Sequence, residues 1–126
     1  MNKNSGDAVD SASFRRASRA VKCLPFKKMF YKEITDKSIN SKELCSKADW
    51  QSYVFAPFGV ARAEGHFRWM IRLGILRREV DGQGLTDRVR LTPLGVAVFN
   101  QWETEIPRAN LRERIQENFR KHALIR

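Results

Sequence analysis

Apolar side chains recur at helical spacing along most of the chain, and this pattern predicts a largely helical protein. Near the start, Phe14, Ala17, Val21 and Leu24 fall on one face of a first helix, which the serines just before them would cap. Pro25 then interrupts the pattern and suits the first turn of a second helix. The first third of the chain is therefore expected to form two consecutive helices.

Two more helices are predicted in the middle of the chain. The shorter would cover residues 42–48 behind a Ser41 cap, and the longer would cover about 58–73. Between them, residues 49–57 have no clear period and are expected to form an ordered loop held by its aromatic side chains. The longer helix has a core stripe spaced i, i+4, i+7 and i+8. This stripe consists of Ala63, Phe67, Met70 and Ile71.

The spacing changes after Gly74, a residue type that commonly ends a helix. Residues 75–80 and 88–91 are then predicted to be strands, because the second run alternates polar and apolar positions. The sequence Asp-Gly-Gln-Gly between them is a turn signal. We therefore expect an antiparallel hairpin. Its core-facing side chains would be Leu76, Val89 and Leu91.

The last two predicted helices follow the hairpin. Thr92 suits the cap of the first, Pro93 suits its first turn, and Pro107 interrupts the chain before the second. The final helix is highly charged apart from an apolar seam at strict i, i+4 spacing. The seam consists of Leu111, Ile115 and Phe119. Either its own domain or a second copy must cover this seam, and we expect a homodimer that buries it between chains.

These elements amount to one domain, which fits a length of 126 residues. Residues 1–10 are small and polar and are expected to form a disordered tail. The folded domain would span residues 11–106, and the amphipathic C-terminal helix would occupy residues 107–126. The expected fold class is α+β and mostly helical.

Residues 67–95 are expected to run as helix, glycine, strand, turn, strand and helix, and they end in the order Leu-Thr-Pro-Leu-Gly. This segment resembles the winged helix-turn-helix domain of MarR-type bacterial regulators. The resemblance implies a winged helix-turn-helix fold with a two-stranded wing and helical extensions at both ends, and it implies binding to DNA. Residues 19–26 and 76–84 are also similar to a small conserved cyanobacterial family, a likeness that implies no particular activity.

The charge balance favours a polyanionic partner. The chain has 24 Lys and Arg residues against 14 Asp and Glu residues, which gives a formal net charge of +10. This excess is typical of proteins that bind a phosphate backbone. We expect duplex DNA as the partner and transcriptional regulation as the role. A protein partner on the same scaffold and structured RNA remain open as alternatives.

The side chains expected to contact DNA are basic residues on three predicted elements, since guanidinium groups suit both phosphates and guanine edges. On the helix over 58–73 they are Arg62, Arg68 and Arg72. On the wing they are Arg77, Arg78, Arg88 and Arg90. On the first helix they are Arg15, Arg19 and Lys22, which would add a flanking phosphate contact.

The sequence gives little support to other chemistry. His66 and His122 stand apart from any catalytic partner and are expected at the surface, while Cys23 and Cys45 lack metal-ligand spacing. There is no obvious carboxylate pair and no phosphate-cradling loop. We therefore expect a non-enzymatic protein without a metal or cofactor. The polar start and the lack of a long apolar run predict a cytoplasmic protein without a membrane partner.

Overall fold

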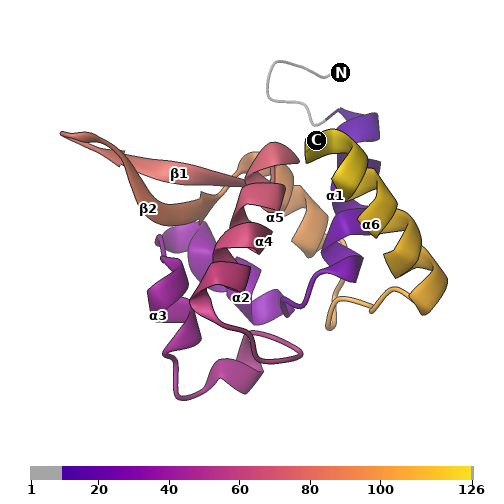
Figure 1. Ribbon diagram of the computed structural model, residues 1–126, viewed down its shortest axis with the longest axis horizontal. Helices are drawn as coiled ribbons and strands as arrows, with labels where there is room; N and C mark the ends of the chain where they lie inside the picture. Colours follow the sequence, from indigo (N-terminus) through magenta and orange to yellow (C-terminus); the bar gives the residue numbers. More distant parts are fainter. Residues whose placement is uncertain (1–9, 126) are drawn as a thin grey trace.

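The structure is a computed structural model that describes residues 10–125. Its fold is α+β and mostly helical, with a layout consistent with a winged helix, as the sequence predicted. Figure 1 shows the order of its elements. They are α1 Ser11–Cys23, α2 Lys28–Asp36, α3 Ser41–Cys45, a 3₁₀ helix at Trp50–Ser52, α4 Val60–Arg72, β1 Leu76–Asp81, β2 Gly84–Leu91, α5 Pro93–Asn100 and α6 Leu111–Ile125.

The predicted wing is confirmed. β1 and β2 form an antiparallel hairpin in which Leu76 pairs with Leu91, and both side chains are buried together with Val89. A short extended segment at Ile39 joins this hairpin, because Ile39 and Val89 exchange two backbone hydrogen bonds of 3.1 and 2.8 Å. From α2 to β2 the chain therefore runs helix, extended segment, helix, helix, strand, strand, which is consistent with the winged-helix layout.

An aromatic cluster forms the centre of the core. Phe26, Phe30, Tyr31 and Phe67 are each at most 1% exposed. The ring centroids of Phe26 and Phe30 lie 4.4 Å apart, and those of Phe30 and Phe67 lie 6.0 Å apart. Aromatic pairs at such distances add about 0.5–1.5 kcal/mol beyond the burial of their area. This packing fixes the rotation of α4 and so determines which of its side chains face outward.

The boundaries of several helices differ from the sequence prediction. α3 is capped by Asn40 rather than Ser41 and ends at Cys45. Asp10 caps α1, since its carboxylate accepts a first-turn backbone N–H at 3.0 Å, whereas we expected a serine there. The rest of the expected tail, residues 1–9, lies outside the described residues. Pro25 does not open α2, which begins at Lys28. Instead, the residue after the proline, Phe26, forms a backbone bridge with Val54 and stays extended.

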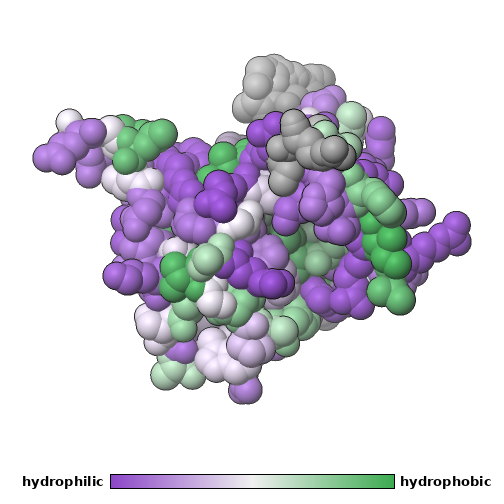
Figure 2. Space-filling model, viewed as in Figure 1, coloured by the Kyte–Doolittle hydropathy of each residue, from purple (hydrophilic) through white to green (hydrophobic). Residues whose placement is uncertain are grey.

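α6 packs beside α1, on the side of the molecule away from the wing (Figure 1). It turns its polar face inward: Glu117 is buried, and the Cys23 thiol lies 3.9 Å from a backbone carbonyl of this helix. Its apolar seam faces outward, and Figure 2 shows it as an apolar ridge along α6. The seam residues are Leu111, Ile115 and Phe119, which are 50–72% exposed. The seam is therefore not covered by the chain's own described residues.

Candidate nucleic-acid interface

α4 presents two arginines one helical turn apart on the face opposite its core stripe. Because Ala63 and Phe67 are buried on the inner face, Arg68 and Arg72 are exposed. The carboxylate closest to Arg68 belongs to Glu64, at 3.9 Å. An exposed ion pair of that length is worth at most about 1 kcal/mol. The guanidinium of Arg68 can therefore be recruited by a ligand at little cost.

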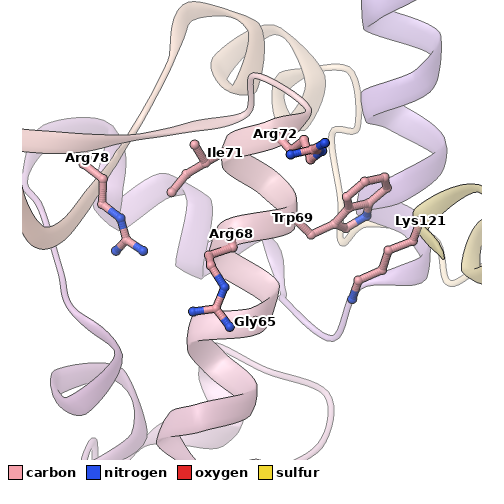
Figure 3. A pocket seen from close by; sticks show the side chains of 7 residues that line it. All are labelled: Gly65, Arg68, Trp69, Ile71, Arg72, Arg78 and Lys121. Carbon is pink, nitrogen blue, oxygen red and sulfur yellow. The ribbon is translucent and has the colours of Figure 1, made fainter. Parts of the chain in front are cut away.

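These two arginines line a groove of ≈ 620 Å³ between the base of the wing and α6 (Figure 3). Every charged side chain that lines the groove is basic. The lining residues are Gly65, Arg68, Trp69, Ile71, Arg72, Arg78 and Lys121. Trp69 is buried and acts as a packing residue. Lys121 comes from α6, and the sequence reasoning missed it because no local pattern connects α6 with α4.

Arg62 is separated from the other two arginines of α4. Six residues of an α-helix correspond to a rotation of about 240°. Arg62 therefore lies on a different side of α4 from Arg68, and it lines a second hollow formed with α1 and α6. The expected face of three arginines is in fact a face of two, Arg68 and Arg72, to which α6 adds Lys121.

Arg88 of the wing is held by residues around α3. Its two terminal nitrogens donate hydrogen bonds of 3.0 and 2.9 Å to the two oxygens of Glu43. It also donates to the side chain and the carbonyl of Ser38, both at 2.9 Å. The hydrogen bonds from Arg88 hold the pKa of the Glu43 carboxyl below its ordinary value. These contacts give Arg88 a structural role in fastening the wing to the domain.

Two further wing arginines also have partners within the protein. Arg78 lies 2.6 Å from a carboxylate oxygen of Glu64, and Arg90 lies 2.7 Å from one of Glu79. Of the four wing arginines, Arg77 alone makes no ion pair with another described residue. The positive charge that the sequence placed on the wing is therefore largely neutralised by internal carboxylates.

The tip of the wing is apolar and acidic. Val80 and Leu85 pair across the hairpin and are 67% and 76% exposed, and Figure 2 shows an apolar patch near the tip. Residues 79–87 contain three acidic residues and no Lys or Arg. Because phosphates repel carboxylates, this tip is poorly suited to follow a DNA backbone.

The basic residues of α1 do not reach the groove beside α4. Arg19 and Lys22 line a separate hollow of ≈ 70 Å³ together with Glu113 and Glu117 of α6. Arg15 is exposed and lines neither hollow. The flanking contact expected from α1 is thus not continuous with the α4 groove.

His66 is half-buried rather than exposed, contrary to the prediction. Its ring lies edge-on to those of Phe26 and Phe58, with centroids 5.6 and 5.4 Å apart. Burial, together with two nearby cations, lowers the pKa of His66 to about 4. His66 is therefore uncharged at neutral pH, whereas His122 is exposed as expected.

The part of the chain that the structure describes, residues 10–125, offers no metal-binding group of three or more His, Cys, Asp or Glu side chains. None of the helices in this range combines the length and the apolar character that crossing a membrane requires.

Residues 8–121, most of the chain, match the model of the Npun_F0494-like family. This match agrees with the resemblance to a small cyanobacterial family and gives no support to membership of the MarR-type regulators. Comparisons with curated proteins and with solved structures gave no match. The chain belongs to the Npun_F0494-like family.

Proposed function

We propose that this protein binds duplex DNA through α4, as a non-enzymatic winged-helix protein with an architecture like that of MarR-type regulators. The supporting observation is the exposure of Arg68 and Arg72 on the helix that lies between α3 and the hairpin. In a winged helix-turn-helix this is the helix that enters the major groove. The role such binding would serve is transcriptional regulation in the cytoplasm, and the free thiols of Cys23 and Cys45 suit a reducing compartment.

In this proposal α4 carries most of the binding, and the wing carries little. Two guanidinium forks one turn apart can contact phosphates or the O6 and N7 atoms of guanine. On the wing only Arg77 is left without an ion pair among the described residues, and the tip is acidic. Lys121 adds a third positive charge beside α4.

Arg68→Ala and Arg72→Ala are each expected to weaken binding to duplex DNA without unfolding the protein, because both side chains are exposed. If an arginine reads guanine, its loss costs about 1–3 kcal/mol and relaxes the preference at one base pair. If it contacts only phosphate, affinity falls evenly for all sequences and the slope of log K against log salt shrinks by about one. Fluorescence anisotropy titrations at several salt concentrations distinguish these results.

Lys32→Ala is the matched control for these variants. Lys32 is an exposed residue of α2 outside the α4 groove, and its replacement removes the same charge. The control should bind DNA like the wild type. If no duplex is bound at tens of micromolar protein, or if the control loses as much affinity as the α4 variants, binding through α4 is wrong. Binding to structured RNA but not to duplex DNA would identify RNA as the partner.

A second candidate function is self-association, and the orientation of α6 favours it. An amphipathic helix ordinarily buries its apolar face, whereas α6 buries Glu117 and leaves its seam exposed. A second copy of the chain offers an identical seam for a symmetric contact. Arg112 follows Leu111 and Arg114 precedes Ile115 in the sequence, and both arginines are exposed, so like charges approach each other when two seams meet.

Phe119→Asp is expected to convert a dimer into a monomer, because it places a carboxylate within the apolar contact. Sedimentation equilibrium measures this change. Raising the salt concentration should strengthen the wild-type dimer by screening the flanking arginines, although it weakens DNA binding. Val80→Asp at the wing tip is the control and should leave the dimer intact. A wild type that is monomeric at all concentrations would contradict the dimer, and an equal effect of Val80→Asp would move the interface to the wing.

A further inference from the structure

The hollow that Arg62 lines is enclosed by three helices that are far apart in the sequence. It lies between α1, α4 and α6 and has a volume of ≈ 240 Å³. Ala20 of α1, Leu24 directly after α1 and Trp69 of α4 provide its apolar wall. The charged wall comes from α4 and α6, so the hollow combines an apolar and an ionic side.

Positive charge is in excess around this hollow. Arg62, Arg114 and Lys121 line it together with one carboxylate, that of Glu117, which leaves a formal excess of two positive charges. His66 also lines the hollow but is uncharged at neutral pH. Within residues 10–125, none of the three cations makes an ion pair.

The nearby carboxylate of Glu117 offsets the charge of the three cations only in part. One oxygen of Glu117 is engaged by Arg120 at 3.2 Å. Lys121 is partly desolvated, and burial, followed by the charge of Arg62, holds the pKa of its ammonium below the ordinary value. Like charges repel more strongly in a partly desolvated space than in water. An anion placed between these cations would relieve their repulsion and accept charge-assisted hydrogen bonds.

We propose that this hollow binds a small organic anion that carries one carboxylate or phosphate group. The guanidinium groups of Arg62 and Arg114 hold the anionic group, and Lys121 adds a third charge. The carbon part of the ligand lies against Leu24 and Trp69. The volume of ≈ 240 Å³ is below the roughly 300–1,000 Å³ of sites that take drug-sized ligands, so the ligand is compact.

The same hollow connects to the α4 groove through shared residues. Lys121 and Trp69 line both spaces. A bound anion partly neutralises the ammonium group of Lys121. This lowers the positive electrostatic potential in the groove beside Arg68. This consequence rests on the proposed DNA binding. If both ligands bind, the anion lowers the affinity for DNA, and DNA lowers the affinity for the anion by the same factor.

Isothermal titration calorimetry of the full chain at low ionic strength tests the site, with benzoate and inorganic phosphate as separate probes. We expect saturable binding of at least one probe. Binding of benzoate alone indicates a carboxylate ligand, and binding of phosphate alone indicates a phosphorylated one. Arg62→Gln and Arg114→Gln should each weaken binding by about tenfold or more, because each removes a hydrogen bond between charged groups.

Arg112→Gln is the matched control, since Arg112 lies on the same helix but does not line the hollow. This variant should bind the probe like the wild type, and thermal unfolding checks that every variant is folded. If neither probe binds saturably, the proposal is wrong. It is equally wrong if Arg112→Gln weakens binding as much as Arg62→Gln, because binding then reflects net charge alone.

DNA titrations separate this site from the proposed function. Anion binding is measured without DNA, so a failure to bind DNA leaves the anion site standing. DNA binding without anion binding overturns only the anion site. If both occur, the anion should weaken DNA binding of the Arg112→Gln control at matched ionic strength, and it should not do so for Arg62→Gln.

Discussion

Replacing Phe67 with alanine is expected to lower the free energy of unfolding by about 3–5 kcal/mol. Phe67 is fully buried, and its ring lies 6.3 and 6.0 Å from those of Phe26 and Phe30. The substitution removes this burial and leaves a cavity that the surrounding rings fill only in part. Because small domains are stable by about 5–15 kcal/mol, the loss is a large fraction of the total. Urea denaturation monitored by circular dichroism measures it.

Phe119→Ala is the matched control, because the same side chain is 72% exposed on α6. It should change the stability of the monomer by no more than about 0.5 kcal/mol. If Phe67→Ala costs less than about 1 kcal/mol, the aromatic core described here is wrong. A loss for Phe119→Ala that grows with protein concentration would instead indicate that a second copy covers the seam.

Gly95→Ala is expected to destabilise the protein by about 1–3 kcal/mol or more through overpacking. A Cβ at this position would lie 2.6 Å from the carbonyl oxygen of Ile75 and 2.5 Å from a methyl carbon of Leu91. The first contact is with backbone, so a change of side-chain rotamer does not relieve it. Thermal and urea denaturation should both show the loss.

Gly65→Ala should have the opposite sign. Gly65 lies inside α4, and a Cβ there meets no atom within 4 Å. Alanine is therefore expected to stabilise the helix by about 0.5–1 kcal/mol relative to glycine. If Gly95→Ala is tolerated as well as Gly65→Ala, the close contact between α5 and the start of the hairpin is not present in solution.

The parts of the fold that depend on local rules were predictable from the sequence. As expected, a glycine follows the end of α4, just before the hairpin. This residue, Gly74, has a φ of +83°, which is a left-handed conformation. Thr92 caps α5, and its hydroxyl accepts the backbone N–H of Gly95 at 3.1 Å. Gly95 itself ends the Leu-Thr-Pro-Leu-Gly stretch, and the close approach of Ile75 explains why glycine suits that position.

The parts that depend on contacts between distant residues were not predictable. Pro25 has the local features of a helix start, but the bridge between Phe26 and Val54 keeps this stretch extended. The same holds for the wing arginines. Their positive charges could be predicted from the sequence, but their ion pairs could not, because carboxylates such as that of Glu43 come from other elements. Lys121 joins the α4 groove only because α6 packs beside it.

The inward polar face of α6 has a consequence for how the molecule opens. Separating α6 from the domain exposes little apolar surface of the helix itself, because its seam is already exposed, and on the domain side it uncovers residues such as Ala20 and Trp69. Apolar burial contributes about 25 cal/mol per Å², so this separation costs far less than exposing the core stripe of α4. The backbone amides of α6 should therefore exchange with deuterium through local opening, well before those of α4. We therefore expect the C-terminal helix to separate from the domain while the rest of the domain stays folded.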